Sequence, residues 1–405
     1  MFSFIKKLNS SQRTLLFACF FAFFCNGSQT LMMGSVMPDL KLAYSLSDTL
    51  SGLFISAHSV GNWVAGFISG LIPLYLGQKK SIVLLSFLSA IGFLMMLVFG
   101  NPAWLFMAFA MVGLGRGSVT NFDNRTVNAL SGGSPAASNL LHASFAIGAI
   151  LAPMAFLVLS RLFSWRAGCV YIACLCILSI LNLSRTHMDN DRPDRKDRSA
   201  RTLEFLKNRS FLILALMMFC YLCSEYSING WLVTYIQNKS ELLSSFRAEG
   251  EALAAAVQSY SQSMATLLWC VILVGRLLCA TLSARISQKK LMMISSFGVV
   301  LFFSLMLFSS TIPAVTFSVA GLGFCMAGIC PMIYSDAAVF TNAYPMATSM
   351  LLGIGSTGAI LMPTVVGALA DRLGFTGGMS AILVTVVLLA VFSTLNAFMK
   401  PRLPE

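Results

Sequence analysis

The sequence predicts an all-α integral membrane protein with twelve transmembrane helices in two pseudo-symmetric six-helix bundles. Three observations predict this class: long apolar runs, charges that gather between the runs, and two halves that resemble each other. The 405 residues are 57% hydrophobic and 10% charged, with a mean hydropathy of +0.80, whereas soluble domains are about 25% charged. Such a chain cannot cover its folded surface with polar groups, so it requires a lipid environment.

The helices follow from the lengths of the apolar runs. A helix rises about 1.5 Å per residue, so crossing a hydrocarbon core of about 30 Å takes roughly 20 mainly apolar residues. A β-barrel would instead show alternating segments of about 10 residues, and these runs do not alternate. Because the first run has no signal-peptide cleavage pattern, we expect it to be retained. Twelve runs qualify: 14–37, 49–76, 81–99, 103–124, 137–162, 167–184, 210–237, 255–282, 291–309, 312–335, 344–369 and 378–398.

The basic residues predict the orientation. Lys and Arg number 27 against 15 Asp and Glu, which gives a net charge of +12. With the N-terminus inside, most of them fall in loops assigned to the cytoplasm, as the positive-inside rule requires. Both termini are therefore expected in the cytoplasm, and the charge needs no nucleic-acid partner. The short external loops favour a bacterial inner membrane.

A charged segment divides the chain into two halves. Residues 185–209 carry eight basic and five acidic side chains and separate six apolar runs from six. We expect an N-terminal bundle over 1–184, a cytoplasmic linker over 185–209 and a C-terminal bundle over 210–405. Two short motifs recur 210 positions apart: 78–80 (Gln-Lys-Lys) returns at 288–290, and 148–153 returns at 358–363. Parallel repeats of this kind are typical of secondary transporters, whose solute sites form near the membrane midplane.

The segment 70–80, with Gly70, Gly77 and the basic pair that follows, resembles the loop between helices 2 and 3 of the major facilitator superfamily, with Leu74 in the place of the aspartate. Further segments are similar to the branch of fucose–proton symporters and their glucose-transporting relatives. These segments are 113–117 with Asn124, 139–142, 224–225 with 230–231, and 275–276. The resemblance covers nearly the whole chain, and it implies the major facilitator fold and secondary transport by alternating access.

Glu225 is the strongest candidate for coupling transport to a proton. It lies about 22 Å along its helix, near the middle of the membrane, and a carboxyl group buried there can load and release a proton. Tyr221 and Asn229 lie one turn either side and share its face. The structural alternative is that Glu225 stays hydrogen-bonded and clamps the two bundles together.

A second group of polar residues predicts a binding site for a polyhydroxylated solute. Asn26 and Gln29 share one face of the first helix, and His58 and Asn62 share a face of the second, with Trp63 beside them. Amides and imidazole exchange hydrogen bonds with hydroxyl groups, and an indole ring stacks on the apolar face of a sugar. Hydrogen bonds that only fix helix packing are the alternative for this group.

The remaining intramembrane charges favour a cytoplasmic gate. Arg116 and Asp123 lie two turns apart in the fourth helix, and the other members also lie towards the cytoplasmic ends of their helices. A direct role in binding an acidic substrate is the alternative for Arg116 or Arg276. The residues assigned to the gate are Arg116, Asp123, Asn124, His142, Arg276 and Asp336.

We therefore expect a monomeric secondary transporter that moves a small polar solute together with a cation. The expected solute is a sugar, and the expected cation is a proton. No phosphate-binding loop or metal-ligand spacing is present, so neither an enzyme nor a cofactor is expected. One proton moving through 100 mV supplies about 2.3 kcal/mol, enough for roughly 50-fold accumulation. Two alternatives remain: an efflux antiporter for amphipathic compounds, which the 32 Phe and 23 Met could accommodate, and a non-transporting membrane sensor.

Overall fold

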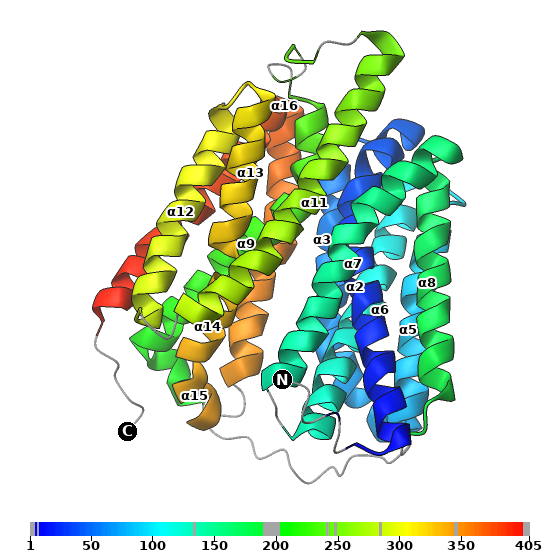
Figure 1. Cartoon of the computed structure of the whole chain (residues 1–405), viewed down its shortest axis with the longest axis vertical. Coiled ribbons are helices and arrows are strands. Elements are labelled where there is room, and N and C mark those ends of the chain that lie inside the picture. Colours follow the sequence, from blue (N-terminus) through cyan, green and yellow to red (C-terminus); the bar gives the residue numbers. More distant parts are fainter. Residues whose placement is uncertain are drawn as a thin grey trace. The chain divides into compact units, whose positions relative to one another are not determined.

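The computed structural model describes residue 5 and residues 8–132, 135–188, 203–239, 242, 244–246, 249–282, 286–343 and 347–399 (Figure 1). The chain divides into two compact units. The first unit comprises Met1–Leu46 and Leu53–Arg198, and the second comprises Ser47–Gly52 and Ser199–Glu405. Residues 189–202 of the expected linker lie outside the described residues, and Leu203–Lys207 form a short 3₁₀ helix, η2.

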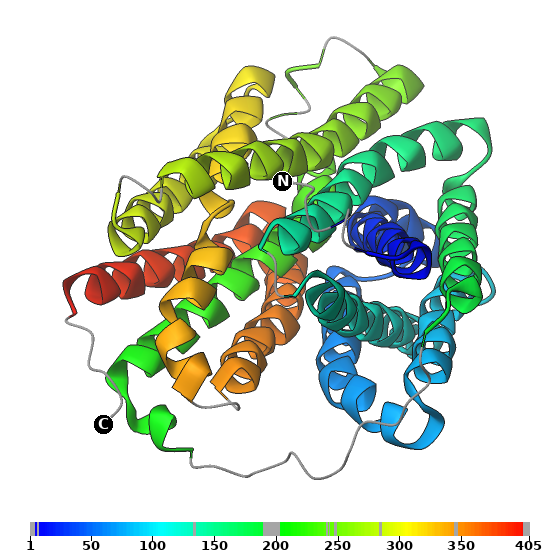
Figure 2. The ribbon, with the colours of Figure 1, turned by 60° about the horizontal axis from the view of Figure 1, so that its bottom comes forward.

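The helices of the first unit are α2 (Ser10–Tyr44), α3 (Asp48–Leu71), α4 (Pro73–Leu76), α5 (Gln78–Met95), α6 (Pro102–Ser131), α7 (Pro135–Leu162) and α8 (Trp165–Arg185). Helix α2 packs against α6, α7 and α8, and α5 packs against α6 and α8. Figure 2 looks more nearly along these helices, with α2 in dark blue among its neighbours.

Helix α2 is longer than the expected run 14–37 because both of its ends are capped. Asn9 and Gln12 form a reciprocal capping box at its start. Ser45 ends the helix in the left-handed conformation, with φ of 51°. Pro38 lies within the helix and does not end it. The helix therefore extends beyond the apolar run from which its length was predicted.

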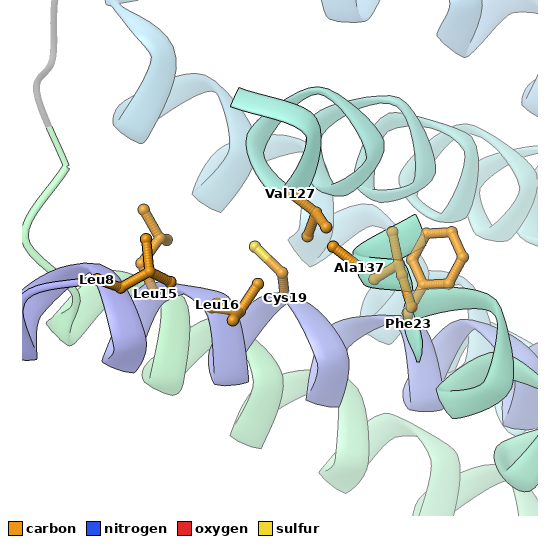
Figure 3. Close-up of a cluster of buried hydrophobic side chains, with 8 residues drawn as sticks. Leu8, Leu15, Leu16, Cys19, Phe23, Val127 and Ala137 are labelled. Carbon is orange, nitrogen blue, oxygen red and sulfur yellow. The ribbon is translucent and has the colours of Figure 1, made fainter. Parts of the chain in front are cut away.

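Apolar side chains hold α2 against its neighbours. One buried cluster joins Leu15, Leu16, Cys19 and Phe23 of α2 to Val127 of α6 and residues of α7. Figure 3 shows Cys19 on the side of α2 that faces the helix carrying Val127.

The helices of the second unit are α9 (Arg209–Gln237), α11 (Gly250–Leu282), α12 (Gln288–Phe308), α13 (Ile312–Met326), α14 (Ile329–Asp336), α15 (Ala338–Ala343) and α16 (Ala347–Phe398). Helix α9 packs most extensively on α16, and α12 packs on both α13 and α16. In this unit the side chain of Trp231 on α9 donates a hydrogen bond of 3.1 Å to the carbonyl of Pro363 on α16.

Helix α16 contains the last two transmembrane segments. Among the described residues, eleven helices are long and apolar enough to span a membrane. The last of them belongs to the 52-residue α16, which at about 1.5 Å per residue is more than twice as long as the hydrocarbon core of a bilayer is thick, about 30 Å. Gly374, with φ of 74° and ψ of 172°, interrupts its helical geometry, a conformation that only glycine adopts without strain. The twelve expected spans are thus present.

Two helices that were expected to be continuous are broken, and proline explains both breaks. The run 49–76 divides between α3 and α4, with Pro73 at the first position of α4. The run 312–335 divides between α13 and α14 at Ala327 and Gly328. Pro331 has no N–H to donate to the carbonyl four residues earlier, that of Ala327, so the helical ladder fails there.

Helix α3 is divided between the units, since Ser47–Gly52 belong to the second unit and the rest of the helix to the first. A side chain of α16 caps its first turn. The Asp371 carboxylate accepts hydrogen bonds from the backbone N–H groups of Asp48 and Thr49, at 2.8 and 2.7 Å. A Cβ added to Gly52 would also collide with the carbonyl of Pro363. A carboxylate at a helix N-terminus satisfies free donors and opposes the positive end of the helix dipole.

The repeated motif at 148–153 and 358–363 makes corresponding contacts in the two units. Gly148 of α7 lies against the Phe24 carbonyl of α2, and Gly358 of α16 lies against the Phe219 carbonyl of α9. A Cβ at either glycine would meet that carbonyl, so a larger residue would force the helices apart. The same short motif therefore sets one close helix contact in each unit.

Candidate functional site

Buried polar side chains from three helices form one cluster in the first unit. Asn26 of α2 is fully buried, and its Nδ2 donates to the Thr120 hydroxyl at 3.1 Å and to the Arg116 carbonyl at 3.3 Å, both on α6. Gln29, one turn further along α2, donates to Oδ1 of Asn26 at 3.4 Å. The amide pair predicted on α2 is therefore linked directly to α6.

Arg116 extends this network to α3. Its Nη1 donates to Oδ1 of Asn62 at 3.2 Å, and its guanidinium lies 5.8 Å from the ring centre of Phe145 on α7. His58, also buried on α3, lies within electrostatic reach of Arg116. We refer to Asn26, Gln29, His58, Asn62, Arg116 and Thr120 as the polar cluster.

Glycines on α6 bring α3 close enough for these contacts. A Cβ on Gly113 would collide with the His58 carbonyl, and one on Gly117 would lie 2.8 Å from the Asn62 side-chain oxygen. On α3, Gly61 makes a similar approach to the backbone of α6 at Ala110. Small residues at helix interfaces permit this close backbone packing, which places Asn62 beside Arg116.

The polar cluster contains hydrogen-bonding atoms that no described residue satisfies. These are Nε of Arg116, Nε2 of His58 and Oε1 of Gln29, all of them buried. Buried polar atoms in folded proteins are nearly always paired, so such exceptions need an explanation. The three atoms offer one cationic donor, one acceptor and one imidazole nitrogen, which together suit a polar solute that has both hydroxyl and charged groups.

The other residues predicted in this half lie outside the polar cluster. Trp63 is 38% exposed, and its ring packs edge-on against Phe67 with centroids 5.1 Å apart. Asn124 donates to the Thr120 carbonyl on its own helix, at 2.8 Å. His142 is exposed and packs edge-on against Phe23, 5.4 Å away. Asp123 is fully buried beside the Cys19 thiol.

In the second unit, Tyr221 and Glu225 lie together as their spacing predicts. The buried hydroxyl of Tyr221 hydrogen-bonds Glu225, and Arg276 of α11 and Cys330 of α14 are within electrostatic reach. Arg276 therefore lies near the residue predicted to carry the proton. Asn229, predicted to bind solute, accepts a hydrogen bond of 3.1 Å from the Trp269 side chain of α11.

Asp336 makes a separate contact within the second unit. Its Oδ2 accepts a hydrogen bond of 2.7 Å from the Asn396 side chain, which joins α14 to α16. Within the described part of the chain, no three His, Cys, Asp or Glu side chains gather in a way that could hold a metal ion.

Sequence reasoning missed Thr120, Phe145 and Trp269 as members of these contacts. Thr120 lies four residues after Arg116 on α6, so helical spacing would have placed it on the same face. Phe145 and Trp269 had no such signal, because the packing of α7 on α2 and of α11 on α9 brings them to their partners.

Comparison with known proteins gives relatives over almost the whole chain. The sialic acid transporter NanX of Escherichia coli K12 is 22% identical over 405 residues, covering 97% of this chain and 95% of that protein. The membrane protein MosC of Rhizobium meliloti is 21% identical over 390 residues, covering 95% of this chain and 91% of that protein.

Solved structures of transporters share the fold. The nucleoside transporter NupG matches with a TM-score of 0.75 at 17% identity, covering 97% of this chain and all of the other. A bacterial homologue of the human lysosomal transporter Spinster, solved facing inward and unoccupied, matches with a TM-score of 0.75 at 15% identity, covering 96% of this chain and 98% of the other. The sequence profile of the Major Facilitator Superfamily matches residues 19–260, more than half of the chain. The chain therefore belongs to the Major Facilitator Superfamily and is a membrane transporter rather than an enzyme.

Proposed function

We propose that this protein carries a small polar solute of the sugar class across the bacterial inner membrane by alternating access, coupled to a proton. The observation that carries the proposal is the polar cluster among membrane-spanning helices. In it the Arg116 guanidinium hydrogen-bonds the amide of Asn62 near the imidazole of His58, and the amide of Asn26 bonds the Arg116 carbonyl. Polar groups at membrane depth are costly and are usually retained for function. The name of NanX, a transporter of an acidic sugar, supports the same solute class.

Proton coupling rests on the second unit. Glu225 is held by Tyr221 on the same helix and lies near Arg276, so loss of a proton from the carboxyl would change its interaction with both neighbours. Such a change can couple proton release to a conformational switch. Within the superfamily, the fucose–proton symporter branch is the relationship that we propose. Residues 1–184 and 210–405 are the two moving halves, and both termini lie in the cytoplasm.

Uptake into proteoliposomes tests the proposal. The purified protein is reconstituted and supplied with radiolabelled fucose, glucose, galactose, glucuronate, galacturonate, N-acetylneuraminate or uridine, with and without an inward proton gradient. We expect at least one sugar or sugar acid to accumulate, and a protonophore to abolish that accumulation. Export of an amphipathic cation such as ethidium, with no uptake of any panel member, would instead support an efflux antiporter. Saturable binding without any transport would support a sensor.

A further inference from the structure

We propose that Arg116 binds a carboxylate of the transported solute, which makes the substrate an acidic sugar or a similar polar monoanion. The inference rests on the proposed function and narrows its substrate class. It starts from burial: Arg116 is only 8% exposed on the membrane-spanning helix α6. A permanent positive charge in such a place is costly unless an anion or several hydrogen bonds compensate it.

The residues around Arg116 compensate the charge only in part. The guanidinium has five N–H donors, and the described contacts are one hydrogen bond to Asn62 and the face of the Phe145 ring. His58 lies within electrostatic reach of the guanidinium. Asn26 and Thr120 donate to the backbone carbonyl of Arg116 rather than to its side chain, and none of these residues is an acid. Their neutral groups orient a solute but do not balance the charge.

The acid closest to Arg116 along α6 does not serve as its partner. Asp123 is seven residues further on, a rise of about 10 Å. Its two buried carboxylate oxygens accept no hydrogen bond from Arg116 or from any other N–H or O–H donor of the described residues. Asp123 lies instead beside Cys19, in the apolar contact between α2 and α6. The charge of Arg116 is therefore left for an anion that arrives with the solute.

The geometry of the unsatisfied atom favours a carboxylate. Nε lies on the edge of a guanidinium that can hold a carboxylate through two parallel hydrogen bonds, and this Nε has no hydrogen-bond partner among the described residues. Nη1, on the other side, is occupied by Asn62. Gln29 Oε1 and His58 Nε2 are also unsatisfied, so groups that can bind hydroxyls accompany the cation. A single cation in this cluster matches a monoanion better than a doubly charged phosphate ester.

The test compares acidic solutes with neutral counterparts of nearly the same shape. Glucuronate is paired with glucose, galacturonate with galactose, and N-acetylneuraminate with its methyl ester, in the proteoliposome assay. For the wild type we expect transport of at least one acid and clear preference over its neutral partner. Arg116→Gln should raise the KM for that acid by roughly 30-fold or more, the change expected from losing a buried charge-assisted hydrogen bond.

Two further variants make the result specific. Arg116→Lys keeps the charge but loses the paired donors, so its KM should lie between those of the wild type and Arg116→Gln. Arg125→Gln removes an exposed arginine from the same helix, and it should transport like the wild type. Size-exclusion elution and the thermal unfolding midpoint establish that each variant is folded. If Arg116→Gln is unstable, the KM of Arg116→Lys is compared with that of the wild type in its place.

Each outcome decides the inference. Transport of neutral members alone would overturn the role of Arg116 and leave the proposed function intact. An equal KM for the acid in the wild type and Arg116→Gln would also overturn it. Transport of no member of the panel would overturn both the inference and the proposed sugar transport.

Discussion

Helix α6 carries two buried charged residues whose surroundings differ. The Arg116 side chain hydrogen-bonds Asn62 of α3, and its carbonyl accepts from Asn26 of α2. Asp123 instead lies between Val119 and Val127, each one turn away, in apolar contact with α2. An ionised carboxylate without a partner is strongly disfavoured in such a place. We therefore expect Asp123 to be neutral, and its contribution to stability to come from its shape rather than from its charge.

Asp123→Asn tests this expectation because asparagine has the same shape and no charge. The free energy of unfolding should change by no more than about 1 kcal/mol, whereas breaking a buried ion pair costs about 3–5 kcal/mol. The matched control is Asp371→Asn. Both oxygens of Asp371 accept backbone hydrogen bonds, so this variant should lose about 1 kcal/mol, as for a lost helix cap. Thermal unfolding in detergent measures both, and a large loss for Asp123→Asn would indicate a charged partner.

Glu225 is predicted to carry the transported proton. Glu225→Gln keeps the size and the hydrogen-bonding reach toward Tyr221 but cannot ionise, so it should abolish gradient-driven accumulation. Exchange of labelled for unlabelled solute should persist, because exchange needs no net proton release. Paired uptake and exchange assays under an imposed pH gradient distinguish these activities, with Glu251→Gln, an exposed residue in the first turn of α11, as the control. Undiminished accumulation by Glu225→Gln would leave Glu225 a structural clamp.

At the scale of residues, helical spacing predicted neighbours on one helix but not partners on others. The pairs Asn26–Gln29 and Tyr221–Glu225 are joined in the structure, as their spacing of three or four residues requires. The contact of Arg116 with Asn62 depends on how closely α3 approaches α6. Sequence distance carries no information about that approach, so the sequence alone did not predict that Arg116 contacts Asn62.

At the scale of elements, Lys239 shows how a helix end is stabilised by a buried cation. Its Nζ donates to the carbonyls of Met306 and Leu307, at 3.0 and 2.6 Å, and to the Tyr235 hydroxyl at 2.8 Å. These carbonyls belong to the last residues of α12, where backbone acceptors have no partner within the helix. The negative end of the helix dipole adds to the attraction.

Lys239→Met should therefore destabilise the second unit. The methionine retains much of the apolar stem but removes the ammonium donor from two buried carbonyls. The single hydroxyl proton of Tyr235, 3.3 and 3.4 Å from their oxygens, cannot serve both, so we expect a loss of about 1–3 kcal/mol. The control is Lys290→Met, because Lys290 is an exposed lysine at the start of the same helix, α12. Thermal unfolding midpoints of the two variants in one detergent measure the difference. Equal midpoints would show that the contacts of Lys239 contribute little to stability.

Helix ends were predicted less well than helix existence, and capping explains why. The run 81–99 was expected to continue to Phe99, but α5 ends at Met95. There the side chains of Trp104 and Tyr44 donate to the carbonyls of Met95 and Met96, at 2.8 and 2.9 Å. Hydropathy measures burial in lipid and contains no information about such caps.

At the scale of the whole molecule, the two units repeat contacts as well as sequence. Lys79, just after the start of α5, donates to the carbonyl of Thr186 at the end of α8, at 2.8 Å. Lys289, 210 positions later and just after the start of α12, donates to the carbonyl of Met399 after the end of α16, at 3.4 Å. Corresponding lysines thus stabilise the end of the last helix in each unit. These contacts give a physical reason for the recurrence of the Gln-Lys-Lys motif, in addition to the effect of its positive charge on orientation.

The same lysines bear on how the chain lies in the membrane. Positive residues are retained on the cytoplasmic side of a bilayer, and the basic pairs at 79–80 and 289–290 mark equivalent loops of the two halves. If these loops are cytoplasmic, the segment between the halves must be cytoplasmic too. Helix α9 then begins inside, and its 29 residues, about 43 Å long, are sufficient to cross to the outside before Asn238.

Cysteine labelling tests this orientation on the two sides of α9. In a variant without the eleven native cysteines that still transports solute, a cysteine replaces either the exposed Asn238 or Asp194, which lies outside the described residues. A membrane-impermeant maleimide should label the cysteine at 238 in intact cells and the one at 194 only after permeabilisation, because α9 separates the two positions. The reverse pattern would invert the predicted orientation. Labelling of both positions in intact cells would show that α9 does not cross the membrane between them.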